Sequence, residues 1–156
     1  MKKGKMELTT MCCVFKKETH EMLFIERKHN WLGLAFPGGH LEPGESITDC
    51  IKREIKEETN LTIQKIVFKG IANFYNTNTE ERLIVFNYFA DDFDGDCFNE
   101  SNEGNLFWLK SSEVQHIKLA DGMEYRVPLF LQEGISEYYV EWSPEKGYTK
   151  VNKIDL

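Results

Sequence analysis

Three glutamates and an arginine in one short segment are of the types and spacing that could do chemistry together. Arg53 and Glu54 are adjacent, and Glu57 and Glu58 follow directly after one further turn. On a helix, residues three and four apart lie on the same face, so the three carboxylates would gather in one place. Mg²⁺ prefers carboxylate oxygens and pairs with substrate phosphates. The segment is therefore a candidate site for metal-dependent phosphate chemistry.

A helix over residues 46–59 is predicted to carry these side chains. Ser46 is a favourable N-cap, because its hydroxyl can accept a hydrogen bond from a free backbone N–H of the first turn. Asn60 is the residue type that, after glycine, best tolerates the left-handed conformation in which helices end. Ile47 and Ile51 recur at the spacing of an apolar helix face, which would pack on the core.

The glutamates of this helix break the usual amphipathic pattern. Successive residues are about 100° apart, which places Glu54 and Glu58 on the same side as Ile47 and Ile51. Burying carboxylates without partners is costly and raises their pKa values. Hard cations among them would remove this cost, and we favour that interpretation. The alternative is a buried network of ion pairs with Arg53 and no metal.

The turn before the helix brings backbone close to the same place. Residues 29–43 are predicted to form a loop, in which Gly38 and Gly39 follow Pro37. Glycine has no Cβ and accepts unusual backbone angles, so the chain can approach a ligand closely there. A backbone carbonyl of this turn could serve as a further oxygen ligand. Most glycine pairs are simply turns, so the pair supports the helix pattern and does not stand alone.

The rest of the pattern predicts one α+β domain, or a layered α/β/α sandwich. A second helix is predicted over residues 123–132, where Pro128 is expected to kink or shorten it. A terminal hairpin of residues 136–142 and 148–154 follows, and residues 91–105 form an acidic loop. The other apolar and β-branched runs are predicted strands, at residues 11–15, 22–25, 61–68, 71–75, 83–90 and 106–109.

Composition excludes several classes of protein. With 41% hydrophobic and 29% charged residues, the 156-residue chain is neither disordered nor of low complexity. Its 19 basic and 26 acidic residues give a net charge of −7, which argues against binding to duplex nucleic acid. No apolar stretch approaches the ~20 residues of a membrane span. The four cysteines lack metal or disulfide spacing, so we expect reduced thiols and a cytoplasmic location.

The turn, the helix and its glutamates together resemble the Nudix box, G-x5-E-x7-R-E-U-x-E-E-x-G-U, in which U is aliphatic. Five residues separate Gly39 from Glu45, and seven more lead to the matching segment of residues 53–61. Every fixed position agrees except that Asn60 stands where the family has glycine, and we expect the helix to end normally there. Within the family, residues 34–40 and the extended tail are similar to bacterial MutT-type 8-oxo-dGTP diphosphatases.

The resemblance implies a fold and an activity. The fold is the Nudix α/β/α sandwich with a mixed central sheet, here as a single domain over residues 1–156 with its box at residues 39–61. The activity is hydrolysis of a nucleoside diphosphate linked to another group, dependent on Mg²⁺ or Mn²⁺. In such chemistry, water attacks phosphorus while the metal neutralises the phosphates.

By position, the resemblance also assigns roles to residues of this chain. Glu54 is a candidate base for the attacking water, although family members differ in this residue. Glu103 lies in the acidic loop, from which family members often supply a further glutamate for metal. Arg53 and Glu45 would brace the helix and the turn. The implied catalytic residues are Glu45, Arg53, Glu54 and Glu57, and the implied metal ligands are the Gly38 carbonyl, Glu54, Glu57, Glu58 and Glu103.

Substrate contacts are expected from residues outside the box. Arg27 and Lys28 follow a predicted strand and either meet substrate phosphates or are ordinary surface charges. Four aromatic side chains could stack on a base, although most aromatic residues belong to the core: Trp31, Phe36, Phe74 and Tyr75. The expected substrate is a small-molecule nucleotide, most simply a nucleoside triphosphate such as 8-oxo-dGTP, cleaved to the monophosphate and pyrophosphate.

Two kinds of alternative stay open. Other Nudix substrates are ADP-ribose, a dinucleotide polyphosphate or an RNA 5′ end, and the negative net charge weighs against long RNA. A non-catalytic nucleotide-binding regulatory module is the rival class, which the intact glutamates argue against. We expect no membrane and no duplex nucleic acid as partners. The aromatic residues of the tail would pack the hairpin or form the contact of a homodimer: Tyr138, Tyr139 and Trp142.

Overall fold

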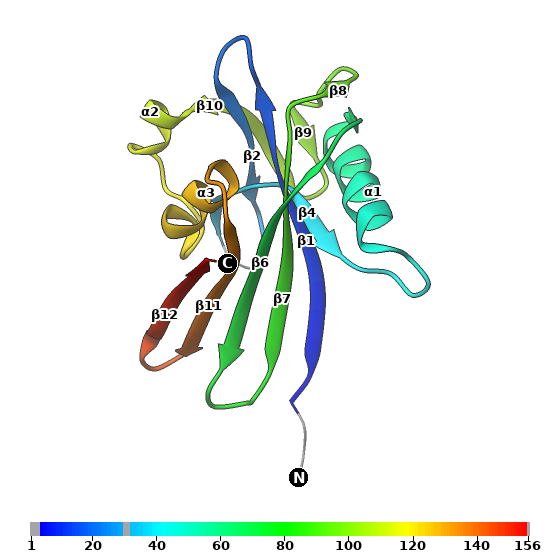
Figure 1. Ribbon diagram of the computed structural model, residues 1–156. Coiled ribbons are helices and arrows are strands. Elements are labelled where there is room, and N and C mark those ends of the chain that lie inside the picture. The colour runs from blue at the N-terminus through cyan, green and yellow to red at the C-terminus, as the bar shows by residue number, and fades with distance from the viewer. Residues whose placement is uncertain (1–3, 30–31, 156) are drawn as a thin grey trace.

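The computed structural model describes residues 4–29 and 32–155, which form a large mixed sheet with helices on both faces (Figure 1). The helices are α1 (Ile47–Thr59), α2 (Ser111–Val114) and α3 (Met123–Leu131). The strands are β1 (Met6–Lys16), β2 (Glu21–Arg27), β3 (Gly33–Ala35), β4 (Gly38–His40), β5 (Thr62–Ile63), β6 (Val67–Asn76), β7 (Arg82–Ala90), β8 (Phe93–Asp94), β9 (Glu100–Ser101), β10 (Gly104–Lys110), β11 (Ile135–Ser143) and β12 (Gly147–Asp155).

Strand β1 is the centre of the sheet. The strands run in the order β12-β11-β6-β7-β1-β2-β10-β9, with β4 also paired to β1 and β3 to β2. Strands β1 and β7 are parallel, as are β6 and β11, whereas the other pairs are antiparallel. In this register, Met11 of β1 lies opposite Asn87 on one side and opposite Gly38 on the other. The sheet is therefore mixed, as expected.

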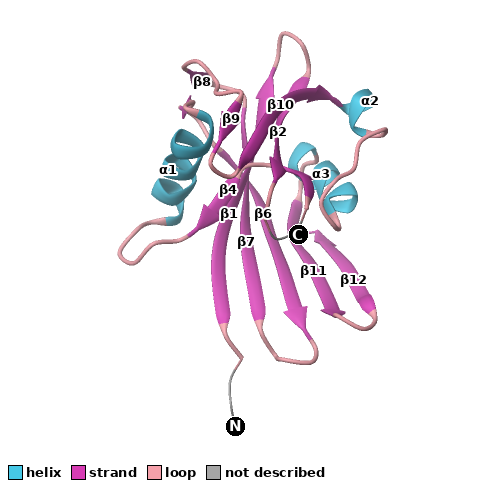
Figure 2. Ribbon diagram, turned by 180° about the vertical axis from the view of Figure 1, so that it is seen from behind, coloured by secondary structure: helices cyan, strands magenta, loops and turns pink. Residues whose placement is uncertain are grey.

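Two hydrophobic cores lie on the two faces of this sheet. Successive residues of a strand point to opposite faces. Accordingly, Cys12 packs in a cluster that contains Ile51 of α1, whereas Met11 packs in one that contains Met123 and Phe130 of α3. Figure 2, seen from behind, again shows α1 and α3 on opposite sides of the sheet. The predicted α/β/α sandwich is confirmed.

The ends of α1 are those that the sequence predicts. The Ser46 hydroxyl accepts a hydrogen bond of 3.1 Å from the backbone N–H of Asp49. At the other end, Asn60 adopts the left-handed conformation with φ of 67°, and its N–H donates to the Lys56 carbonyl. The terminal hairpin is also confirmed, since β11 and β12 pair antiparallel. All four cysteines are free and three of them are buried.

Several predicted boundaries are wrong. The loop predicted over residues 29–43 contains β3 and β4, because pairing with β2 and β1 makes strands of segments that are too short to show a pattern. The acidic loop similarly contains β8 and β9. The strand predicted over residues 61–68 is instead β5 and the start of β6, which runs on through an irregularity at Gly70, where φ is 82°.

The C-terminal helix and the tail depart from expectation in smaller ways. Helix α3 continues past Pro128 to Leu131, and the short α2 has no sequence signal that we identified. Tyr138 is buried in the core with its ring edge-on to Phe74, so it packs within the molecule. Trp31 lies outside the described residues. Across the part of the chain that is described, no helix is long and apolar enough to cross a bilayer.

Candidate active site

The glycine pair holds β4 unusually close to its neighbours. A Cβ on Gly38 would overlap the backbone of Thr10 in β1, and a Cβ on Gly39 would overlap the carboxylate of Glu54 in α1. Neither glycine has a positive φ. Their role is therefore close approach, and the unusual backbone angles that glycine permits are not used here. The pair clamps strand β4 between the central strand and the glutamate-bearing helix.

Helix α1 presents its three glutamates along the side that faces this clamp. The side chain of Glu54 is 14% exposed, that of Glu57 is 60% exposed, and Glu58 is partly buried. The backbone N–H of Gly38 donates a hydrogen bond of 3.1 Å to Oε2 of Glu58. The structure thus brings Gly38 against Glu58 and Gly39 against Glu54, whereas no contact joins Glu57 to either glycine among the described residues.

Arg53 is the cation that binds this group together. Its Nε and Nη2 donate to the two carboxylate oxygens of Glu45 at 2.6 and 3.1 Å, a bidentate pair. Its Nη1 donates to Glu54 at 2.9 Å and to Glu57 at 3.1 Å. Nη2 also reaches the His40 carbonyl at 3.1 Å. One guanidinium therefore ties the turn to the helix, and its hydrogen bonds lower the pKa of Glu45 to about 2.

The glutamates carry more negative charge than this arginine can neutralise. Burial, and next the charge of Glu54, raises the pKa of Glu58 to about 8. Burial also raises the pKa of Glu54, against the opposing effect of Arg53. Smaller contributions to the pKa of Glu58 come from Glu103, which raises it, and from Arg27, which lowers it. Arg27 and Glu103 therefore act electrostatically on the same carboxylate.

The remaining residues predicted from the sequence, Lys28, Phe36 and Glu103, do not all lie in the site. Lys28 pairs with Glu100 at 2.8 Å on the surface and does not line the cavity described below. Phe36 does line that cavity, although it is only 1% exposed and stacks on Phe24 with ring centroids 4.8 Å apart. Glu103 is exposed in the turn between β9 and β10.

These residues suit a divalent cation in donor type and charge. Among the described residues, no three His, Cys, Asp or Glu side chains are placed to hold one ion as they stand, and Arg53 occupies oxygens of both Glu54 and Glu57. The donors are nonetheless hard oxygens of the kind that Mg²⁺ prefers. Burial first, and then the charge of Glu54, raises the pKa of Glu58, so a cation beside this carboxylate would offset both effects. The donor set therefore fits Mg²⁺ or Mn²⁺.

The pKa of Glu58 predicts how pH changes stability without metal. Its pKa of about 8 in the folded protein exceeds the ordinary 4.5, so the folded state holds a proton that the unfolded state has lost. This contribution is complete below about pH 4.5 and disappears as pH rises through about 8. In EDTA, the melting temperature of the wild type should fall from pH 6 to pH 8.5, and Mg²⁺ should raise it more at pH 8.5. Glu58→Gln should show a flatter pH dependence; an unchanged slope would contradict this assignment.

The two glycines should respond differently to alanine. In Gly38→Ala, the new methyl meets backbone, which cannot move aside, so we expect a loss of about 1–3 kcal/mol in stability. In Gly39→Ala, it meets only the flexible end of Glu54. That variant should melt near the wild type but lose about 10- to 100-fold in turnover, because a displaced catalytic group is costly. Thermal melting and steady-state kinetics on both variants test the contrast, and equal melting losses would refute it.

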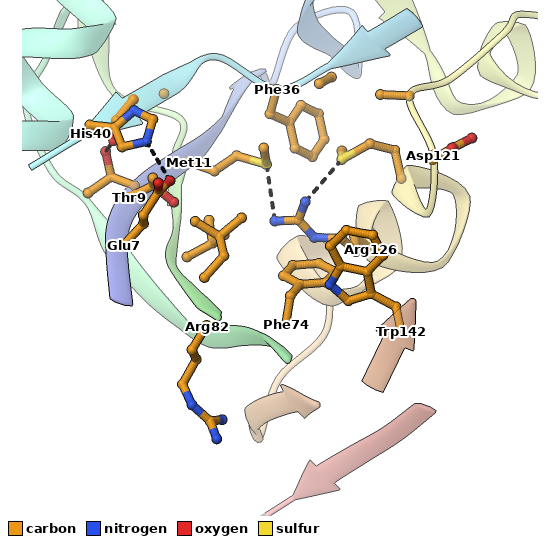
Figure 3. A pocket seen from close by; sticks show the side chains of 18 of the residues that line it. Glu7, Thr9, Met11, Phe36, His40, Phe74, Arg82, Asp121, Arg126 and Trp142 are labelled. Carbon is orange, nitrogen blue, oxygen red and sulfur yellow. Dashed lines mark hydrogen bonds and ion pairs between the residues drawn. The ribbon is translucent and has the colours of Figure 1, made fainter. Parts of the chain in front are cut away.

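A cavity of about 310 Å³ opens beside the glutamate cluster. Gly38, which binds Glu58, and Arg27, which acts on it, both line this cavity. The rest of the wall mixes apolar side chains such as Phe74 with charged ones such as Glu7, Arg82 and Asp121 (Figure 3). Arg126 of α3 also lines it. The cavity therefore adjoins the glutamate cluster through Gly38, although none of the three α1 glutamates lines it.

Sequence reasoning missed Arg126, although a signal was present. Helix α3 has Met123, Val127 and Phe130 on its buried side, at the spacing of an apolar helix face, and Arg126 lies at the same side. A charged residue on an apolar face is the same irregularity that marks the glutamates of α1.

Comparisons with known proteins bear on the family and the fold of this chain. A family model described as the NUDIX domain matches residues 6–130. The chain is 27% identical over 137 residues to the uncharacterized Nudix hydrolase YvcI of Bacillus subtilis, with 85% of each chain covered. It is 30% identical over 96 residues to the oxidized purine nucleoside triphosphate hydrolase of Mus musculus, covering 62% of this chain and 61% of that one. The crystal structure of a MutT protein from Bacillus halodurans superposes with a TM-score of 0.80 at 25% identity, covering 94% of this chain and 97% of that one.

Proposed function

Because this chain belongs to the Nudix hydrolase family, whose members are pyrophosphohydrolases of nucleoside diphosphate-linked compounds, we propose that it cleaves nucleoside triphosphates to the monophosphate and pyrophosphate. The observation that carries the proposal is the position of Gly38, which binds Glu58 and also lines the cavity. A nucleotide with its base in the cavity would direct its phosphates toward the glutamates of α1.

Each residue of the cluster has a role in this proposal. Glu54 is the candidate base for the attacking water, since its raised pKa moves it toward the operating pH, as a proton acceptor needs. Arg27 lines the cavity next to Glu58 and would meet the phosphates. Arg53 and Glu45 hold the helix against the turn. Glu57, Glu58 and the Gly38 carbonyl are the proposed metal ligands, with Glu103 from the neighbouring turn.

A divalent cation completes the proposed site. Nudix hydrolases generally need Mg²⁺ or Mn²⁺. When bound, such an ion neutralises phosphate charge and lowers the pKa of the attacking water. We propose the same requirement here, with a small-molecule nucleotide as the substrate. The description of the mouse relative as an oxidized purine nucleoside triphosphate hydrolase supports a triphosphate substrate, and 8-oxo-dGTP is one candidate.

The decisive experiment is a substrate panel with product identification. The wild type with Mg²⁺ is offered dGTP, 8-oxo-dGTP, ADP-ribose, diadenosine tetraphosphate and a capped RNA oligonucleotide, and products are separated by ion-exchange chromatography. We expect a nucleoside triphosphate to be the preferred substrate and to yield monophosphate and pyrophosphate in equal amounts. Isotopically labelled water would show which phosphorus is attacked.

Other outcomes of the panel separate the alternatives. Preferred cleavage of ADP-ribose, the dinucleotide or the capped RNA would replace the triphosphate proposal with another Nudix substrate. No turnover of any compound, with nucleotide binding retained, would identify a regulatory module. Turnover in EDTA equal to that in Mg²⁺ would contradict the proposed metal requirement.

A further inference from the structure

The cavity holds a buried cation that the proposed hydrolysis does not use. Arg126 is only 6% exposed, and its guanidinium points toward Met11 (Figure 3). Its Nη2 lies 3.4 Å from the sulfur of Met11, and its Nη1 lies 3.6 Å from the sulfur of Met123. Thioether sulfur is a weak acceptor. A ligand with oxygen or nitrogen acceptors could therefore displace the sulfur partner of each amino group of the guanidinium.

Stronger partners for this cation are lacking in residues 4–29 and 32–155. Its Nε has no hydrogen-bond partner there, and no carboxylate pairs with it. The ring of Phe74 lies 5.2 Å from the guanidinium carbon and gives a weak cation–π contact. Burial lowers the pKa of Arg126 to about 10. Since an unpaired buried charge is costly, the site is arranged for a ligand that brings acceptors.

We propose that Arg126 is a specificity-determining residue that donates hydrogen bonds to the adjacent acceptors O6 and N7 of a 6-oxopurine, guanine or hypoxanthine, in the cavity. The inference rests on the proposed hydrolysis of nucleoside triphosphates and names their base. Arginine matches this acceptor pair with two parallel hydrogen bonds. Adenine presents an amino donor at position 6, and 8-oxoguanine carries a hydrogen on N7. Each of these bases would therefore face the guanidinium with a donor, so among the candidate triphosphates the inference favours dGTP and dITP over 8-oxo-dGTP.

The arrangement of the cavity supports this orientation of the nucleotide. Gly38 and Arg27 mark the phosphate side, next to Glu58, and Arg126 lies on the α3 side of the cavity. The apolar rings of Phe36 and Phe74 also line the cavity and suit a base, and the ring of Phe74 lies against the guanidinium of Arg126 (Figure 3). A cavity of about 310 Å³ is at the small end for ligand sites, which fits one base better than an extended ligand. Flexible methionine side chains can make room as the base arrives.

The test removes one acceptor at a time. The wild type with Mg²⁺ is compared on dGTP, 7-deaza-dGTP, dITP, dATP and 8-oxo-dGTP, and kcat/KM is measured for each. We expect dGTP and dITP to exceed the other three by about tenfold or more. In Arg126→Met, the ratio of dGTP to 7-deaza-dGTP should fall to about one, and Arg126→Lys, which keeps charge without the fork, should lie between.

Controls separate recognition from folding. Arg126→Met should melt at or above the wild-type temperature, because it removes an unpaired buried charge. Equal kcat/KM for dGTP and 7-deaza-dGTP in the wild type would overturn the inference, and this comparison needs no variant to fold. An equal loss on all five substrates in Arg126→Met would also overturn it.

The inference and the proposed function can fail separately. If no triphosphate is hydrolysed, the proposed function fails. Binding then decides the inference alone, from the shift in melting temperature that dGMP and 7-deaza-dGMP produce in the wild type. A larger shift with dGMP would support recognition of N7, and equal shifts would overturn it.

Discussion

Glu57→Gln is expected to lower kcat/KM for the preferred triphosphate by about 10²–10³-fold, since loss of metal-based charge stabilisation costs several kcal/mol and each 1.4 kcal/mol is tenfold. Glutamine keeps the size of the side chain but not its charge. The carboxylate of Glu57 is 60% exposed and is bound by Arg53 alone among the described hydrogen bonds. The folded protein should therefore tolerate the change, with a melting temperature close to that of the wild type.

A matched control distinguishes this effect from a general change in charge. Glu18 is exposed in the turn between β1 and β2, and Glu18→Gln makes the same chemical change there. Its kcat/KM and its dependence on Mg²⁺ concentration should equal those of the wild type. Equal turnover by Glu57→Gln and the wild type would show that the metal ligands have been assigned to the wrong residues.

The local part of the site could be predicted because a helix has fixed geometry. Three glutamates at spacings of three and four residues must share a face once Ser46 and Asn60 set the ends of α1. The partial burial of Glu54 follows from the same geometry. The bidentate bond of Arg53 with Glu45 was not expected from the helix pattern, since it depends on how the turn folds back.

The shape of the cavity could not be predicted, because its walls come from distant parts of the chain. Met11 and Arg126 are 115 residues apart in sequence and meet only through the packing of α3 on the sheet. The short strands β3 and β4 were missed for a similar reason. Their backbone partners in β1 and β2 make them strands, and three residues carry too little periodicity to show it. The sequence marks Arg126 as a charged residue on an apolar helix face. Its contact with Met11 of β1 could not be predicted, because it depends on how α3 packs on the sheet.

Arg53→Met is expected to disable the site from a position that need not touch the substrate. The guanidinium of Arg53 binds Glu45, Glu54 and Glu57. The Arg53 side chain is 23% exposed and that of Glu45 is 13% exposed, so this pair is largely shielded from water. Without it, the turn and the helix lose their common partner and three carboxylates are left to repel one another. We expect a lower melting temperature and a fall of about 10- to 100-fold in turnover at saturating Mg²⁺, the usual effect of losing a residue that orients metal ligands.

The geometry of Arg53, more than its charge, should decide this result. Arg53→Lys restores a positive charge but only as a point, whereas the guanidinium reaches Glu45, the His40 carbonyl and Glu54 in fixed directions. The lysine variant should therefore recover part of the melting temperature and little of the turnover. Lys52→Met, on the exposed side of α1, removes the same charge and should change neither quantity. If Arg53→Lys regained wild-type turnover, Arg53 would act as a simple counter-charge, and its directional hydrogen bonds would not be what positions the glutamates.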